Sequence, residues 1–484
     1  MGSKWKKYTI EELAAPEKNA LSTGPFGSAI SSKFFVSAGV PVIRGGNLSA
    51  DTSSRMSDEG LVFVSNEKAI EFHRSIVKRD DLIFTCWGTI NQIGLIDDSC
   101  KYGKYIISNK QMKITLDKGK AYPLFVYYLF SSPEKQREIL RNGIGAAVPG
   151  FNLGQLKSHV VTLPSVTEQV KIADFINEFD KKITLNRQIN QTLEQMAQAL
   201  FKSWFVDFDP VVDNALDAGF FEQNSDLPEA LLRRAEQRKA VREQPDFKPL
   251  PAETRQLFPA AFEECEEPSL GLGGWVPKGW ACSPLNAFIN LIGGGTPKTS
   301  EESFWGGDIP WFSVVDAPND SDVFVLKTEK YITEAGLSNS SAKLLRVGTT
   351  IISARGTVGK CALVGTPMAM NQSCYGINGI DGVADNFVYF MVRHLVSQLR
   401  QRSHGSVFST ITRDTFNSLK FIFPNVSLND GFKDQTANWF ERIHINNRQL
   451  SILQDLRDTL LPKLISGELR LNDDGILASG NTDR

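Results

Sequence analysis

Two stretches of the chain place residues at the alternating spacing of three and four that is typical of a coiled-coil helix. The first seam consists of Ile176, Phe179, Ile183, Asn186, Asn190, Leu193, Ala197 and Leu200. The second seam lies 260 residues later and consists of Thr436, Trp439, Ile443, Asn446, Leu450, Leu453, Arg457 and Leu460. Each has a polar centre, at Asn186 and at Asn446, and a buried amide at such a position fixes the register of paired helices. We therefore predict long helices at residues 165–205 and 426–470, with Asn186 and Asn446 forming a polar layer.

The predicted helices are too long to stand alone. A helix from residue 168 to 204 would measure about 55 Å at 1.5 Å per residue, more than the width of a small domain. An amphipathic helix lying on its own domain is the alternative. The matched seams favour pairing of the two helices, and an antiparallel pair with one globular domain at each end is the simplest arrangement that buries both.

The sequence that precedes each long helix is rich in strands. Short β-rich runs are Leu82–Cys86, Gln111–Leu116, Gly348–Ser353 and Lys420–Phe423, and the clearest helical stretches are Tyr122–Leu140 and Asn386–Gln401. Glycines, prolines and polar loops separate these runs. We predict a compact mixed α/β domain, dominated by its sheet, at residues 1–164 and again at 271–425.

A long internal repeat relates the two halves. Leu82–Thr89 matches Thr350–Thr357 at an offset of 268 residues, Asn109 meets Asn371 at an offset of 262, and Trp5 falls opposite Trp280. A period this long exceeds any solenoid unit, so each copy is a whole domain with its helix. The predicted fold class is α+β, with two β-rich mixed α/β domains in tandem repeat, separated and joined by two long helices that form an antiparallel coiled coil. Residues 206–270 are a connecting segment and residues 471–484 a C-terminal tail.

Composition narrows the class of protein. The chain has 484 residues, 41% hydrophobic and 22% charged, as in folded globular proteins. No apolar stretch approaches the roughly 18 residues of a membrane span, so we expect a cytoplasmic protein without membrane contact. The six cysteines and five histidines lack the spacing of a zinc site, and we expect no metal.

The net charge of −2 conceals opposite regions. Lys and Arg outnumber Asp and Glu by 21 to 15 in residues 1–164 and by 13 to 11 in residues 271–425, whereas residues 206–270 have 7 against 15. The basic excess of each globular domain is compatible with a phosphate-binding surface, although solvated faces often carry such excesses.

The glycine-rich runs do not match a nucleotide-binding loop. Gly293–Thr299 has the wrong spacing for a phosphate loop and contains Pro297, which lacks a backbone donor. Gly356–Lys360 lacks the first glycine and is followed by Cys361 where Ser or Thr binds magnesium. We find no catalytic constellation and expect that the chain is not an enzyme.

Polar residues recur on corresponding loops of the two copies. Arg, Asn and Gln can hydrogen-bond guanine or adenine edges, and Lys, Ser and Thr can hold phosphates. The candidate DNA-binding residues are Arg44, Asn47, Thr89, Asn91, Lys110 and Gln111 in the first copy and Lys298, Ser313, Arg355, Thr357, Lys360 and Gln372 in the second. The alternative for each residue is that it caps a turn or satisfies loop backbone.

Three motifs resemble the DNA specificity subunit of type I restriction-modification systems. They are Leu200–Pro210 after the first helix, Gly274–Trp280 at the start of the second domain and Leu461–Leu469 at the end of the second helix. The resemblance covers nearly the whole chain. It implies two target-recognition domains, each reading one half of a split site in double-stranded DNA, held apart by the paired helices.

The resemblance also implies protein partners. Two modification subunits would bring S-adenosylmethionine, and restriction subunits would bring ATP and magnesium, so no cofactor is expected in this chain. A buried aromatic cluster is a typical anchor for a partner, and we predict docking through Trp204, Phe205 and Phe208, with Lys202 and Lys463 beside it. The alternative function is a scaffold or antirestriction decoy that binds the modification subunits without DNA.

Overall fold

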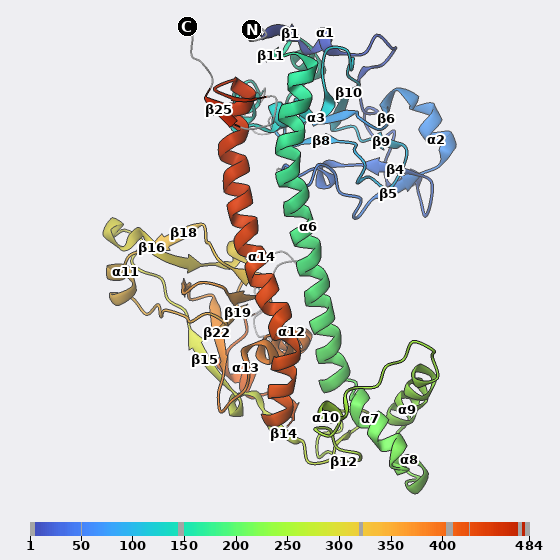
Figure 1. Cartoon of the computed structure of the whole chain (residues 1–484), viewed down its shortest axis with the longest axis vertical. Helices are drawn as coiled ribbons and strands as arrows, with labels where there is room; N and C mark the ends of the chain where they lie inside the picture. The colour runs from blue at the N-terminus through green and yellow to red at the C-terminus, as the bar shows by residue number, and fades with distance from the viewer. Residues whose placement is uncertain are drawn as a thin grey trace. The chain divides into compact units, whose positions relative to one another are not determined.

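The computed structural model describes residues 5–49, 51–143, 150–318, 323–402, 410–424, 426–472 and 477–479. It divides into two units, Met1–Leu185 with Leu450–Arg484 and Asn186–Gln449. Each unit contains one β-rich domain and one half of each long helix (Figure 1).

The described residues of the first domain form three sheets. The four-stranded sheet has the order β2 (Leu21–Thr23), β10 (Gln111–Ile114), β7 (Leu82–Thr85), β8 (Ile93–Leu95). The five-stranded sheet has the order β3 (Phe35–Val36), β5 (Val62–Val64), β4 (Val40–Ile43), β9 (Tyr105–Ile107), β6 (Ile76–Val77), and the third sheet pairs β1 (Lys6–Thr9) with β11 (Val160–Leu163). The helices are α1 (Ile10–Leu13), α2 (Asn66–Glu71), α3 (Pro123–Ser131), α4 (Pro133–Arg141) and α5 (Leu153–Ser158).

The second domain repeats this plan. Its main sheet has the order β15 (Ile289–Gly293), β22 (Cys374–Gly379), β19 (Thr350–Ser353), β20 (Cys361–Val364), β17 (Phe324–Val325). A three-stranded sheet has the order β18 (Lys330–Ile332), β16 (Trp305–Phe312), β21 (Ala369–Met370), and two-stranded sheets pair β14 (Ala281–Pro284) with β23 (Lys420–Phe423) and β12 (Phe262–Glu264) with β13 (Trp275–Pro277). The helices are α11 (Glu334–Ser338), α12 (Asp385–Gln401) and α13 (Arg413–Asn417). The parallel pair β4 and β9 recurs as β16 and β21, so the internal repeat extends to strand topology.

The two long helices lie close to their predicted bounds. α6 spans Val166–Phe205 and α14 spans Val426–Ser466. In the second unit Asn186 bonds Gln449, whereas Asn190, further along α6, bonds the earlier residue Asn446, so the helices run antiparallel there. The predicted α+β fold class is confirmed.

One predicted helix is two helices. Residues Tyr122–Leu140 divide into α3 and α4, and Ser132 between them has extended backbone and caps α4 with its hydroxyl. Pro133 explains the break, because the residue before a proline is pushed out of the helical region. The predicted helix Asn386–Gln401 corresponds to α12.

The connecting segment is itself folded. It forms α7 (Asp209–Asp217), α8 (Phe220–Gln223), α9 (Glu229–Arg242) and α10 (Ala252–Arg255) before β12. Aspartates on α7 pair with arginines four residues apart on α9: Asp209 with Arg234, Asp213 with Arg238 and Asp217 with Arg242. Each of these pairs is neutral, so the ladder leaves the acidic excess of residues 206–270 unchanged. The tail pairs β24 (Leu469–Leu471) with β25 (Leu477–Ser479).

Candidate nucleic-acid interface

Loops at one edge of the first domain are tied together by backbone hydrogen bonds. Ser108 N donates to Ile43 O at 3.0 Å, Cys86 N donates to Lys110 O at 2.7 Å, and Phe151 N donates to Cys86 O at 2.8 Å. These bonds join the loops 44–47, 86–92, 108–110 and 150–152, which we name the first loop cluster.

A fifth loop belongs to the first loop cluster. Gly24 N donates to Gln111 O at 2.8 Å, and a Cβ on Gly24 would lie 1.8 Å from Ser108 O. Glycine is required at this position because the two backbones approach too closely for a side chain. Asn109 Nδ2 also donates to Gly27 O at 3.0 Å, so the loop 24–27 lies beside the loop 108–110.

The second domain has the same scaffold. Asn371 N donates to Phe312 O at 2.9 Å, Ala354 N donates to Ser373 O at 2.8 Å, and Ile411 N donates to Ala354 O at 2.9 Å. These bonds join the loops 313–316, 354–360, 371–373 and 410–412. Gly295 N also donates to Met370 O at 2.9 Å, so the loop 294–298 belongs with them, and together they form a second loop cluster equivalent to the first.

The equivalent hydrogen bonds shift the alignment of the two copies by one residue at this loop. The bond to Ile43 is made by Ser108 and the equivalent bond to Phe312 is made by Asn371, so Ser108 matches Asn371 and Asn109 matches Gln372. The sequence had matched the two asparagines because they are identical. Strand register decides otherwise, since Gln111 pairs with Thr85 as Cys374 pairs with Ser353.

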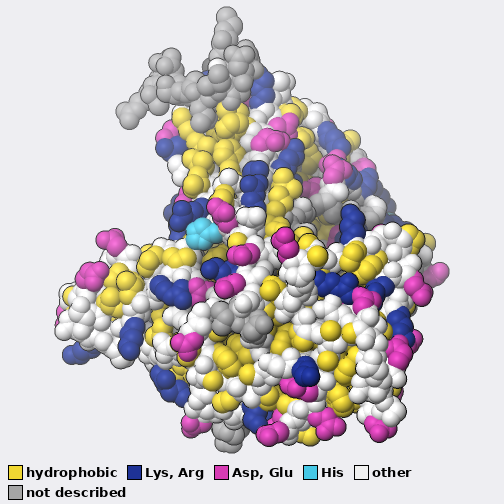
Figure 2. Space-filling model, turned by 60° about the horizontal axis from the view of Figure 1, so that its bottom comes forward, with side chains coloured by type: hydrophobic (Ala, Val, Ile, Leu, Met, Phe, Trp, Pro, Cys, Tyr) yellow, Lys and Arg dark blue, Asp and Glu magenta, His cyan; other side chains and the backbone are white. Residues whose placement is uncertain are grey.

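Most of the predicted DNA-binding residues lie on these clusters with exposed side chains. Exposed residues are Arg44, Thr89 and Lys110 in the first cluster and Lys298, Arg355, Thr357, Lys360 and Gln372 in the second, whereas Asn91 and Ser313 are half-buried. Among the exposed candidates all charged side chains are basic, which suits contact with phosphates. On the face shown in Figure 2, basic and acidic side chains are intermixed.

Two of the predicted residues serve the fold. Asn47 is 4% exposed, its amide donates to Ser57 O and Glu59 O at 3.0 Å each, and its Oδ1 accepts from Arg44 N at 3.0 Å. Gln111 is fully buried, and its Oε1 accepts from Ser108 N at 3.2 Å. A base edge cannot reach either amide, so these two predictions are corrected. Asn47 caps the turn after β4, as Asp316 does for Ser313 in the second domain.

The structure adds an exposed aromatic residue that the candidate set omitted. Trp87 is 50% exposed, and it forms an isolated bridge with Gly150 just as Arg355 does with Thr410. Trp87 therefore occupies in the first cluster the place that Arg355 occupies in the second. The alignment of Cys86-Trp87-Gly88 with Ala354-Arg355-Gly356 is the sequence signal that could have found it.

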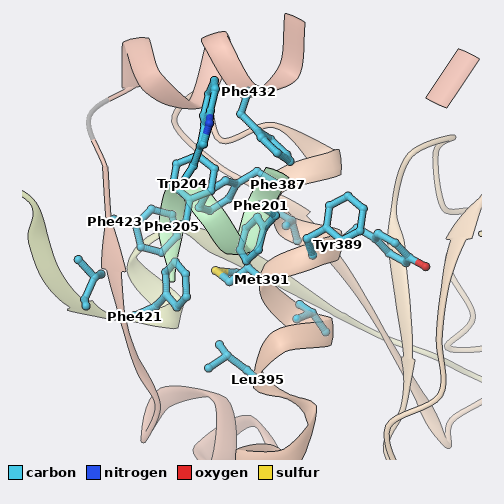
Figure 3. Packing of buried hydrophobic residues seen from close by; sticks show 14 of the residues in the cluster. Phe201, Trp204, Phe205, Phe387, Tyr389, Met391, Leu395, Phe421, Phe423 and Phe432 are labelled. Carbon is cyan, nitrogen blue, oxygen red and sulfur yellow. The ribbon is translucent and has the colours of Figure 1, made fainter. Parts of the chain in front are cut away.

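The prediction that Trp204, Phe205 and Phe208 dock a partner subunit is wrong. Trp204, Phe205 and Phe208 are each 1% exposed. Phe205 packs edge-on against Phe387 with ring centroids 4.9 Å apart, and Trp204 does so against Phe258 at 5.1 Å. Figure 3 shows Trp204 and Phe205 surrounded by other aromatic residues of the same core. The connecting segment contributes Phe258 to this core and leaves the three side chains no surface for a partner.

The two lysines predicted beside that segment remain near the surface. Lys202 is exposed and forms an ion pair with Asp207. Lys463 is half-buried, and its Nζ lies 4.0 Å from a Glu468 carboxylate oxygen.

The polar layer of the paired helices is present. Asn186 and Asn446 are fully buried. Asn186 Nδ2 donates to Gln449 Oε1 at 3.2 Å, and Asn446 Nδ2 donates to Asn190 Oδ1 at 2.8 Å. Asn190 Nδ2 in turn donates to Asn447 Oδ1 at 2.6 Å. Because these amide nitrogens donate to the facing helix, a slipped register would break the buried hydrogen bonds.

In the first unit a buried carboxylate on α6 holds the domain to the helix. Asp180 is 2% exposed, accepts from Tyr128 OH at 2.6 Å and pairs with Arg457 Nη1 on α14 at 2.9 Å. Arg55 Nη2 lies 3.6 Å from Asp180, and Arg55 Nη1 pairs with Asp97 at 2.6 Å. Burial raises the pKa of Tyr128 and the Asp180 carboxylate raises it further, so the phenol keeps its proton and donates.

The second unit has a corresponding contact. Glu194 on α6 is 3% exposed, pairs with Arg393 on α12 and accepts from Tyr389 OH at 3.4 Å. The domain that carries each loop cluster is thus fixed to α6 by a buried acid.

Within the described ranges, no group of three or more His, Cys, Asp or Glu side chains is arranged to hold a metal ion. A search of the same residues finds no helix long and apolar enough to cross a membrane.

Fold and loops together define a class of protein: two copies of one β-rich domain, each presenting basic and polar loops, joined by paired antiparallel helix segments. The model of the type I restriction modification DNA specificity domain matches residues 2–195 and 277–436, and the chain belongs to this family. It is 30% identical over 407 residues to the type I restriction enzyme HindI specificity subunit of Haemophilus influenzae, covering 82% of this chain and 88% of that protein.

Two further comparisons span most of the chain. The putative type I restriction enzyme MjaX specificity subunit of Methanocaldococcus jannaschii is 20% identical over 441 residues, which cover 90% of this chain and 88% of that protein. The crystal structure of the type I restriction-modification S subunit from M. genitalium has a TM-score of 0.52 at 14% identity and covers 96% of both chains. At this identity the structural likeness concerns the fold alone.

Proposed function

We propose that this protein is the DNA specificity subunit of a type I restriction-modification complex and that it recognises an asymmetric bipartite target. The observation that carries the proposal is the repeated loop scaffold. The same three backbone hydrogen bonds present Arg44, Trp87 and Lys110 in one domain and Ser313, Arg355 and Ser373 in the other. One scaffold with two sets of side chains is suited to two half-sites of different sequence.

Within this proposal the chain has no catalytic activity of its own. Modification subunits supply S-adenosylmethionine and methyl transfer, and restriction subunits supply the chemistry that needs ATP and magnesium. The curated relatives support this division, since they are named specificity subunits. Lys202 and Lys463 remain candidates for contact with a modification subunit, whereas Trp204, Phe205 and Phe208 do not.

The test is to sequence the methylated bases of DNA treated with the chain assembled with its modification subunits. We expect one interrupted motif whose two halves differ, and no methylation by the isolated chain. A continuous motif, a palindromic motif or methyl transfer by the chain alone would each contradict the proposal.

A second measurement separates the proposal from a decoy that binds modification subunits without DNA. The assembled complex should bind duplex DNA with an affinity that falls as salt rises, because Lys and Arg contacts release counterions from the phosphates. Assembly without salt-dependent DNA binding would favour the decoy.

A further inference from the structure

The first loop cluster presents an apolar surface at the point where the second presents a charge. Trp87 follows the end of β7 as Arg355 follows the end of the equivalent strand β19. Each residue is followed by a glycine with positive φ, 90° at Gly88 and 73° at Gly356. The backbone therefore projects both side chains from equivalent turns. Since Arg355 has the donors to bond a guanine edge, the two domains must use different chemistry at this position.

Trp87 is held in a defined orientation. A Cβ built on Gly150 would lie 2.7 Å from Cζ3 of the indole and 3.0 Å from both Cε3 and Cη2. Three adjacent ring atoms at nearly equal distances place Gly150 over a face of the ring, because a neighbour beyond the ring edge would be much farther from the second and third atoms. One face thus packs on backbone, and half of the residue's surface remains exposed.

This packing restricts how the indole can contact a duplex. A side chain that intercalates between base pairs needs both of its faces free, and Gly150 covers one face of Trp87. Contact with a groove needs only the edge and the other face. In the major groove the one apolar group that bases present is the C5 methyl of thymine, and apolar side chains pack against it.

We propose that Trp87 is a specificity-determining residue that packs against a thymine methyl in the half-site read by the first domain. The inference rests on the proposed function and extends it to the chemistry of one base position. It assigns apolar contact to the first domain at the position where the second domain uses Arg355.

The test uses duplexes that carry the motif found by methylation sequencing, with each thymine in turn replaced by deoxyuridine, which lacks the methyl group. Burial of one such group is worth about fourfold in affinity. We expect about a fourfold loss at one thymine of one half-site for the wild-type complex and no loss at that position for Trp87→Ala. Thymines of the other half-site should respond equally in both proteins.

Three variants keep the result interpretable. Gly150→Ala retains Trp87 but displaces its ring, and it should also remove the discrimination. Trp87→Arg installs the side chain of the second domain and should shift the preference at that position towards guanine. Phe34→Ala removes another exposed aromatic residue of the same domain, 41% exposed, and should leave every deoxyuridine effect unchanged.

The outcomes separate the inference from the proposed function. A wild-type complex that shows no sequence-specific binding would refute the proposed function. Specific binding with the same deoxyuridine profile in wild type and Trp87→Ala would overturn the inference and leave the function standing. The Trp87→Arg variant identifies the half-site that the first domain reads. If that half-site has no thymine on either strand, the inference is also overturned.

Discussion

Asp180→Ala tests whether the buried carboxylate holds the first unit together. The substitution removes the acceptor of the Tyr128 hydroxyl and the ion pair of Arg457, whose side chain is 6% exposed. Removing one partner of a buried ion pair typically costs about 3–5 kcal/mol, because the remaining charge stays buried. Arg457 retains Asp458 at 2.8 Å and Asp51 at 3.4 Å, and Arg55 retains Asp97. We therefore expect the lower end of that range, about 3 kcal/mol.

Hydrogen exchange measured on peptides provides the assay, because it resolves the two units within one chain. A loss of about 3 kcal/mol corresponds to an increase of about 150-fold in the opening equilibrium. We expect this increase for peptides from 166–185 and 450–466, and little change for peptides from α12.

The matched control is Glu178→Ala on the same helix. Glu178 pairs with Lys181 at 2.7 Å, but both side chains are well exposed, at 70% and 63%. An exposed pair of this kind is worth about 0.2–1 kcal/mol. Equal effects of the two substitutions, or a loss spread evenly over both units, would refute the assignment of Asp180 as a buried anchor.

Three further substitutions are informative. Arg355→Ala should lower affinity by about 1–3 kcal/mol and relax one base position of the motif, whereas equal weakening on all sequences would identify a phosphate contact. Phe205→Ala should lower the free energy of unfolding by about 3–5 kcal/mol in chemical denaturation. The control is Leu232→Ala, which should cost less than about 1 kcal/mol because Leu232 is 42% exposed. Unchanged stability of Phe205→Ala together with weaker subunit assembly would restore the docking hypothesis. Burial and the Lys135 ammonium, 3.1 Å from Nε2, lower the pKa of His159 in the folded state. The contribution of His159 to stability is therefore present at pH values above the ordinary pKa of about 6.5, and it is lost as pH falls through the folded-state pKa. Unfolding at a series of pH values should show this loss in the wild type and a smaller one in His159→Gln.

Local patterns were sufficient for the two long helices, for several strands and for the existence of the repeat. The spacing of apolar residues is a property of the helix itself, so the seams that contain Asn186 and Asn446 predicted α6 within one residue. They also predicted the start of α14, which ends four residues before the predicted bound. Short β-rich runs likewise marked strands such as β7 and β23. The internal repeat then indicated two related domains, because a chain that duplicates a fold preserves its hydrophobic pattern.

Tertiary structure decided which side chains are available for contact. Trp204, Phe205 and Phe208 have the composition of a docking segment, but the folded connecting segment covers them, and nothing local to residues 204–208 encodes that. Asn47 and Gln111 have the chemistry to bond a base. The folded loop after β4 uses the Asn47 amide for its own backbone, and strand pairing turns Gln111 inward. Strand register also moved the match of the two copies from Asn109 to Ser108. Exposure is a property of the packed molecule, and a local pattern does not contain it.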